Sequence, residues 1–134
     1  MTIIEGLIDW LQEYPEAFID IQVDQLDGVQ DSYGVFKLPN SNVTNYIDGT
    51  QDIQENYMFA FRKPTTQDFQ RITNTDWMEK LEKWIETQNE ERNLPIVTGV
   101  NIYNIKVSST AYMSESSEED GVYQLSLEVE YERS

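Results

Sequence analysis

The sequence predicts an α+β domain in which two amphipathic helices pack on one face of an antiparallel or mixed β-sheet. Three observations carry this prediction. The chain opens with apolar residues at helical spacing, and a second such run follows its middle. Segments of alternating apolar and polar residues lie between and after these runs. Because each alternating segment offers one apolar face, the economical packing places both helices over that side of the sheet.

The first helix is expected within residues 2–14. Thr2 and Glu5 have the spacing of a capping box, and Pro15 is expected to end the helix. The apolar stripe predicted for this helix consists of Ile3, Ile4, Leu7, Ile8 and Leu11.

Two strands are expected in the next part of the chain. Residues 17–26 alternate and are typical of a half-buried strand with Ile19, Ile21 and Val23 on one face. Residues 35–39 form a short second strand candidate. Residues 40–50 are rich in turn-forming residues, with Asp48-Gly49 as a turn signal. Since segment 27–52 has little to bury, we expect it to be the least ordered or the most partner-dependent part of the fold.

The middle of the chain predicts a strand and then the longest helix. Residues 55–64 place Tyr57, Phe59 and Phe61 on one face of a strand. A cap at Thr75 or Asp76 is expected to begin the helix, and Asn93-Leu94-Pro95 to stop it. The stripe expected to cover the sheet consists of Trp77, Leu81, Trp84, Ile85 and Gln88.

Two long strands are expected to close the chain as an antiparallel hairpin. In residues 103–113 the predicted apolar face is Tyr103, Ile105, Val107, Ala111 and Met113. In residues 122–133 it is Tyr123, Leu125, Leu127, Val129 and Tyr131, alternating with polar residues that include three glutamates. Residues 114–121 form an acidic connecting loop.

Composition indicates a single domain, residues 1–134, with a strongly acidic surface. The formal net charge is −16, and residues 1–55 hold one basic residue against eleven acids. Such a surface disfavours DNA binding, because Lys and Arg supply most of the affinity for phosphates. The chain has no cysteine, which excludes disulfides and thiolate metal sites. Its acidic N-terminus and the lack of long apolar runs indicate a cytosolic protein without membrane segments.

The residues that most enzymes use for catalysis are scarce in this sequence. It contains neither histidine nor cysteine, and no Gly-rich phosphate loop or dinucleotide motif occurs. The sequence has so many carboxylates that a pair resembling the catalytic pair of a glycosidase does not indicate that activity. Asp24, Asp27 and Gly28 do not fall at the spacing of a calcium-binding EF-hand. We therefore expect a protein that is not an enzyme, with no catalytic residue, no metal site and no cofactor.

Residues 56–95, followed by "IKVSSTAYM" and "GVYQLSLEVEYE", resemble the small minor capsid or tail-terminator proteins of siphophages and prophages of Gram-positive bacteria. The resemblance rests on an aromatic-x-Phe-x-Phe-x-Arg strand at 57–62 and on a helix ending Trp-Ile-Glu-x-Gln-Asn at 84–89. The Asn-Leu-Pro stop at 93–95 and a final strand ending in tyrosine complete it. Residues 25–50 match no part of the family pattern.

The resemblance implies a virion component without enzymatic activity, located at the head–tail junction and made in the cytoplasm of the host bacterium. It implies a ring, a hexamer to match a tail tube of stacked hexamers, that caps the tube and contacts head-completion or connector proteins. DNA would pass through the lumen without specific binding. The scarce basic groups expected to meet a neighbour's carboxylates are Arg62, Lys63, Arg71 and Arg92.

An alternative from another class fits the same composition. A stand-alone acidic cytosolic module could act as an inhibitor that mimics nucleic acid, because clustered carboxylates reproduce the charge of phosphates. Genes for portal, head-completion and tail-tube proteins beside this one would favour the tail terminator.

Overall fold

The computed structural model describes residues 2–14, 21–23, 26, 32–64, 68–116 and 120–133. In chain order the elements are α1 (Ile3–Leu11), β1 (Ile21–Val23), β2 (Ser32–Asn45), β3 (Gln51–Pro64), α2 (Asp68–Glu90), β4 (Val100–Ser116) and β5 (Asp120–Arg133). These elements confirm the predicted α+β class. In the described ranges, no helix is long and apolar enough to cross a membrane.

The five strands form one mixed sheet in the order β1-β2-β3-β5-β4. β1 runs parallel to β2, and every other neighbouring pair is antiparallel. β4 therefore forms one edge of the sheet. Because β1 pairs with β2 only at residues 33–35, the rest of β2 forms the opposite edge.

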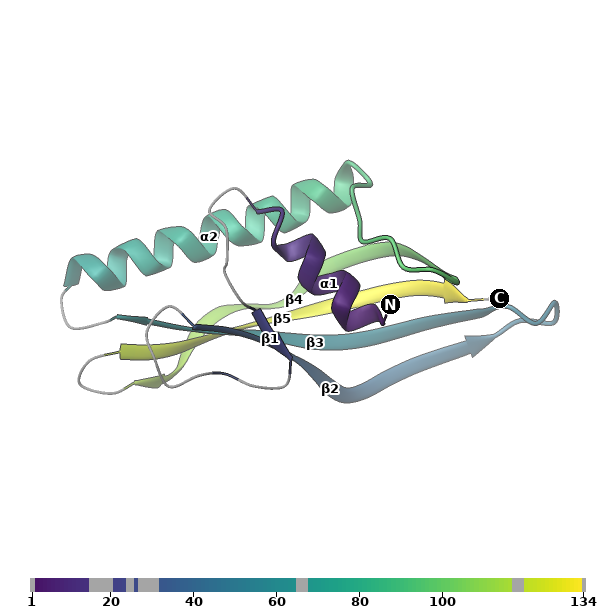
Figure 1. The fold of residues 1–134 in the computed structure, drawn as a ribbon, viewed down its shortest axis with the longest axis horizontal. Helices are drawn as coiled ribbons and strands as arrows, with labels where there is room; N and C mark the ends of the chain where they lie inside the picture. Colours follow the sequence, from purple (N-terminus) through teal and green to yellow (C-terminus); the bar gives the residue numbers. More distant parts are fainter. Residues whose placement is uncertain are drawn as a thin grey trace.

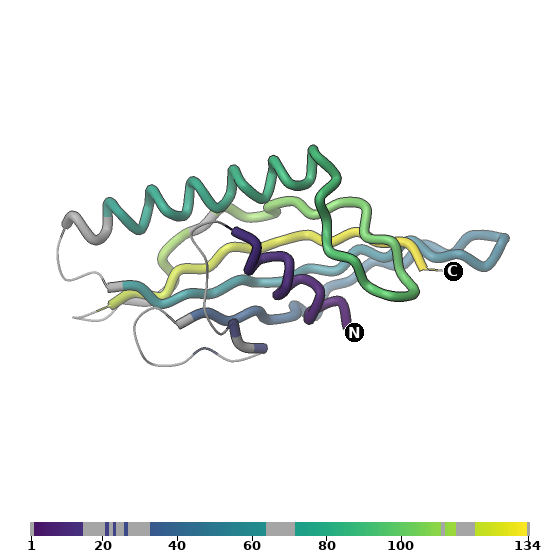
Figure 2. The backbone as a smooth tube through the Cα atoms, turned by 45° about the horizontal axis from the view of Figure 1, so that its top comes forward, coloured from purple at the N-terminus to yellow at the C-terminus, as the bar shows by residue number. Residues whose placement is uncertain are grey.

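Both helices lie on the same face of the sheet, as the sequence predicts (Figures 1 and 2). Alternate residues of β3 and β5 point toward them and are fully buried, because a pleated strand sends successive side chains to opposite faces. The central members of this buried set are Tyr57, Phe59, Phe61, Leu125 and Leu127. The other face of the sheet carries no helix in the described part of the chain (Figure 1).

α1 begins at the predicted cap residue, because Thr2 Oγ1 accepts a hydrogen bond of 3.2 Å from the backbone N–H of Glu5. The helix ends at Leu11, ahead of Pro15, which lies outside the described residues. The core takes Leu7, Trp10 and Leu11 from this helix. Trp10 was missed by the predicted stripe, although its spacing from Leu7 is helical. The predicted residues Ile3, Ile4 and Ile8 are only partly buried.

α2 begins at Asp68, so the prediction that Thr75 or Asp76 caps it is wrong. Asn74 is buried inside the helix, and its side-chain amide donates a hydrogen bond of 3.4 Å to the hydroxyl of Tyr123 on β5. This contact with the sheet stabilises a helical turn that local propensity alone would not favour.

The predicted stop of α2 is confirmed, with one change in detail. The helix ends at Glu90, and the backbone N–H of Asn93 donates to the carbonyl of Gln88 at 2.9 Å. The residue in the left-handed region is Arg92, with φ of 62°, although asparagine, which follows at position 93, tolerates this conformation better.

The tryptophan stripe of α2 covers the sheet largely as predicted. Leu81 and Ile85 are fully buried, and Met78, which the prediction omits, joins them. Trp77 lies against Phe61 of β3, with ring centroids 4.9 Å apart. Trp84 instead contacts α1, because its ring lies 5.1 Å from that of Trp10.

β2 is much longer than the predicted strand at 35–39. Residues 40–45 belong to it and pair with β3, so the prediction of turn structure there is wrong. Their polar side chains are exposed, and the backbone ladder rather than burial holds them in a strand. Pro39 falls in a break of register between Lys37 and Ser41, where a missing N–H is tolerated.

The turn at Asp48-Gly49 is confirmed. Gly49 has φ of +91°, and Asp48 Oδ1 accepts hydrogen bonds from the backbone N–H and the hydroxyl of Thr50 at 3.0 and 2.7 Å. Of the segment 27–52 that was expected to be least ordered, residues 27–31 lie outside the described residues. Residues 32–45 form β2, so for this part the expectation of low order is wrong, whereas dependence on a partner stays a prediction.

The remaining strands differ from prediction at their ends. In the described part of 17–26 the strand is Ile21–Val23, with Ile21 buried and Val23 exposed. Residues 17–20 and 24–25 lie outside the described set. In β4 four register shifts break the simple alternation. Ile102 and Ile105 are buried as a result, whereas Met113 is 43% exposed. Strand pairing continues to Ser116 and resumes at Asp120, so the predicted loop 114–121 is too long.

Candidate functional site

The helix-free face of the sheet gathers acidic side chains from its two central strands. Asp52 on β3 pairs with Glu132 on β5. The next row on the same face pairs Gln54 with Glu130, and the one after it pairs Asn56 with Glu128. We call Asp52, Glu128, Glu130 and Glu132 the carboxylate face. It occupies the half of the sheet nearest the C-terminus (Figure 1).

Neutral donors from β4 and from the turn after β2 hold these carboxylates in place. Asn104 on β4 donates to Glu130 at 3.0 Å, and the Tyr103 hydroxyl donates to the same carboxylate at 3.3 Å. The Tyr46 hydroxyl donates to Asp52 at 2.7 Å, and this hydrogen bond raises the pKa of Tyr46. Because neutral groups supply these contacts, the negative charge of Asp52 and Glu130 is positioned without being cancelled.

Glu128 has a cation beside it. Lys106 on β4 approaches Glu128 at 2.9 Å, and Gln54 of β3 also donates to this carboxylate. The hydrogen bond to Glu128 raises the pKa of Lys106 above its usual value. Among the described residues, Lys106 is the ammonium group that pairs with a carboxylate of this face. Its single positive charge leaves the carboxylate face with a net negative charge.

Tyr103 connects the carboxylate face to the edge of the sheet. Burial, followed by the charges of Asp52 and Glu130, raises its pKa to about 12. The phenol therefore stays neutral at physiological pH and serves as a hydrogen-bond donor. It lines a hollow of about 170 Å³ on this face, shared with Asn42, Thr44, Asp52 and Glu130.

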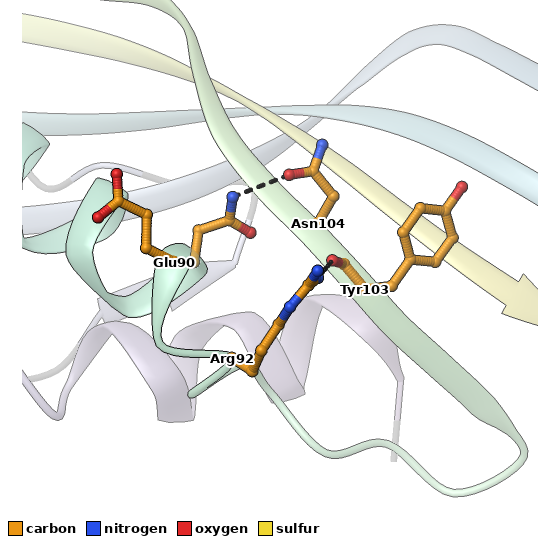
Figure 3. Close-up of a pocket in the computed structure, with 5 residues that line it drawn as sticks. Glu90, Arg92, Tyr103 and Asn104 are labelled. Carbon is orange, nitrogen blue, oxygen red and sulfur yellow. Dashed lines mark hydrogen bonds between the residues drawn. The ribbon is translucent and has the colours of Figure 1, made fainter.

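A second hollow of about 370 Å³ lies where α2 ends beside β4, and Tyr103 lines it as well (Figure 3). There Arg92 Nη1 donates to the backbone carbonyl of Tyr103 at 3.0 Å. Asn89 Oδ1 accepts from the backbone N–H of Ile105 at 2.9 Å, and its Nδ2 donates to Asn104 at 2.9 Å. Asn89 and Arg92 therefore make the hydrogen bonds that a neighbouring strand would otherwise make at this point of the β4 edge.

The sequence-predicted basic residues do not come together. Arg62 pairs with Asp120 at 3.2 Å. Lys63 donates to the Tyr33 hydroxyl at 2.8 Å and lies over the ring of Trp77, 4.7 Å from its centroid. Both lie at the C-terminal end of β3, near the start of α2, whereas Arg92 follows the other end of that helix (Figure 1). The side chain of Arg71 falls outside the described residues.

The carboxylate face was missed as a site, although part of its signal is visible in the sequence. Glu128, Glu130 and Glu132 alternate along one strand and so must share a face. Asp52 could not be added to them, because only the register of β3 against β5 brings it there.

The chemical character of this face is that of a fixed negative surface. In the described ranges, no three His, Cys, Asp or Glu side chains are grouped closely enough to hold a metal ion. The arrangement of alternating carboxylates and amides favours repulsion of phosphates over their capture. A comparison with protein-family models and with curated proteins found no match to this chain.

Proposed function

We propose that this protein is a tail terminator, a non-enzymatic virion component that forms a ring on the phage tail tube and joins it to the head-completion proteins. The observation that carries the proposal is the carboxylate face on the helix-free side of the sheet. The resemblance of residues 56–131 to the tail-terminator family supports it from the sequence. The proposed location is the head–tail junction, after synthesis in the host cytoplasm.

A ring around a DNA channel needs one face of each subunit that does not bind phosphates. Affinity for DNA comes mainly from Lys and Arg that replace counterions. The carboxylate face holds four carboxylates and one paired ammonium, Lys106. If this face lines the lumen, passing DNA is repelled by the wall at every step. The helices then lie on the outside of the ring, where they stiffen each subunit.

The ring closes by heterologous contacts between identical subunits, and matching a hexameric tube sets its order at six. A charge of −16 per subunit opposes closure at low salt, because like charges repel over a Debye length of about 10 Å at 0.1 M. We therefore expect monomers in dilute low-salt buffer and rings at higher salt, higher concentration or on the tube. Of the basic residues first singled out, Arg92 lies at the β4 edge and is our choice for an interface contact.

The proposal is tested by deleting the gene from the phage or prophage that carries it and viewing the lysate by electron microscopy. We expect full heads without tails, together with tails of abnormal length, and normal virions when the intact gene is supplied on a plasmid. Normal virions in the absence of the gene would refute the proposal.

The role of the carboxylate face is tested by complementing the deletion with a Glu130→Lys/Glu132→Lys variant. Tails should still be capped, but DNA delivery should slow, because the basic wall now binds phosphates. The matched control is Glu90→Lys/Glu91→Lys, which makes the same change of charge at the exposed end of α2. Equal delivery by the two variants would remove this face from the lumen.

The same face would serve the alternative function, in which an acidic module mimics nucleic acid. Such a module should bind a DNA-binding protein of its host as a monomer, and its deletion should leave virion assembly intact. The deletion experiment therefore separates the two proposals directly.

A further inference from the structure

The acidic residues avoid the edges of the sheet. The central strands β3 and β5 together hold six acids, whereas the edge strands β2 and β4 hold one, Glu115. Charges on edge strands usually keep other chains away, and apart from Glu115 the charged residues of these two strands are Lys37 and Lys106. In a chain with 25 acids, these edges are where a second copy can approach with the least repulsion.

The two edges also match each other in direction. β2 is antiparallel to β3, β3 to β5 and β5 to β4, so β2 and β4 run in opposite directions. Rotating a subunit about an axis along the strands would place β2 of one copy antiparallel beside β4 of the next. Such a rotation keeps all helices on the outside and every carboxylate face on the inside.

The edges match in charge at the same level of the sheet. Lys37 is the one charged residue of β2, and its row continues through Tyr57 and Leu127 to Val107 on β4. Its side chain is 55% exposed and points to the helix side, where the ammonium pairs with Glu55 at 2.5 Å. An ammonium has three donors, so Lys37 can contact a second carboxylate as well.

A groove of about 380 Å³ lies on the helix side of β4 at this level. Val107 and Thr110 of β4 line it from below, and Glu82 and Glu86 of α2 line it from above. Lys106 also borders it, with its ammonium held by Glu128 of the carboxylate face. The groove therefore offers the Glu86 carboxylate at the position that Lys37 of a neighbouring copy would reach.

We propose that the β2 edge, residues 36–45, docks against the β4 edge of a second copy of this chain, with Lys37 entering the groove beside Glu86. The inference rests on the ring of the proposed function and names the two surfaces that build it. Because Asn89 and Arg92 already satisfy the Ile105 N–H and Tyr103 carbonyl, the contact at this point is made by side chains. Arg92 then lies inside the interface.

Cross-linking tests the proposal cleanly, because the chain has no cysteine. Thr44 and Asn101 are exposed and lie in the same row, one on each edge. The Thr44→Cys/Asn101→Cys variant, treated with a short bis-maleimide at high concentration in added salt, should give a ladder of oligomers ending in one largest species. Each single variant should stay unlinked, as should the control Thr44→Cys/Glu79→Cys, which moves one cysteine to an exposed site on α2.

A charge reversal tests the groove. Glu86→Lys should weaken self-association, measured by sedimentation, by about tenfold, because it replaces an attraction with a repulsion from Lys37. Glu79→Lys makes the same change of net charge on the same helix and should strengthen association slightly, because it lowers the overall repulsion. Thermal unfolding of both variants checks that the fold is kept.

Three results would overturn the inference. The first is a cross-linked dimer of a single-cysteine variant, which indicates an isologous contact. The second is that the double-cysteine variant gives no ladder of oligomers at any concentration. The third is that Glu86→Lys and Glu79→Lys change self-association equally. Failure here is distinguishable from failure of the proposed function. A deletion phage with unterminated tails but no ladder would reject only these surfaces, whereas a ladder with normal deletion phage would reject only the terminator role.

Discussion

The contact between the two helices should be a main source of stability, and Trp84→Ala tests it. Trp84 is partly buried and lies 5.1 Å from the ring of Trp10 and 5.4 Å from that of Tyr14. Full burial of a tryptophan makes truncation cost about 3–5 kcal/mol. Because Trp84 is only partly buried, we expect about 3 kcal/mol, which lowers Tm by roughly 10 °C in a domain of this size.

Trp10→Ala should cost more, about 5 kcal/mol. Trp10 is 1% exposed, and its Nε1 donates to the carbonyl of Asn93 at 2.7 Å, a bond that the variant also loses. Because the two rings touch, the double variant should be about 1 kcal/mol more stable than the sum of the single effects predicts.

Urea unfolding followed by circular dichroism measures all three variants with one method, and Glu79→Ala on the exposed side of α2 is the control. A Trp84→Ala variant within about 0.5 kcal/mol of the parent, the range of ordinary surface changes, would show that α1 does not pack on α2 in solution. The tryptophan stripe would then have to be a docking surface for another molecule.

Three further predictions follow from single sites. Gly49→Ala should destabilise the protein by about 1 kcal/mol in the same urea assay, because φ is +91° there while nothing lies within 4 Å of the added methyl; no effect would mean that the turn relaxes. Lys37→Met should lower the free energy of unfolding by about 3 kcal/mol, because it leaves the 5%-exposed Glu55 carboxylate without its cation. Glu55→Gln should lower it by about 1 kcal/mol, because it leaves only an exposed ammonium without its partner. The reverse order of the two effects would contradict the ion pair. The pKa values of Tyr103 and Tyr131 are both raised to about 12, chiefly by burial, so these phenols stay protonated in the folded state while those of the unfolded chain ionise near 10. Stability is therefore full below about pH 10 and falls between about pH 10 and 12, and Tyr103→Phe should reduce that fall in alkaline unfolding curves, whereas an unchanged curve would contradict the raised pKa.

Local pattern was sufficient to predict the elements that are stabilised by one buried face. The alternation in β5 predicted five of its seven buried residues, and the spacing of Thr2 and Glu5 predicted the start of α1. The turn at Asp48-Gly49 and the stop after α2 also depend on neighbours within a few residues. These elements predicted the α+β class, because amphipathic helices and half-polar strands can bury their apolar faces against each other in only a few arrangements.

Elements stabilised by distant partners were missed or cut short. Residues 40–45 have the composition of a turn and form a strand because β3 supplies a backbone ladder. The first turns of α2 are polar, and Asn74 is held there by Tyr123, which lies much later in the chain. In β4 the register shift between Ile102 and Asn104 puts Ile102 on the same buried face as Ile105, since a bulge changes which face the residues beyond it take.

The same distinction between local pattern and distant contacts applies to the candidate site. The sequence by itself determined that the protein is acidic, that three glutamates share one face of the last strand, and that Arg62, Lys63, Arg71 and Arg92 are scarce cations. Only the tertiary structure decided that Asp52 joins those glutamates, that Arg62 and Lys63 are engaged within the chain, and that the acid-poor strands are the two edges. The physical reason is that strand order and register depend on hydrogen bonds between segments far apart in sequence. The local periodicity of a sequence does not show which segments pair.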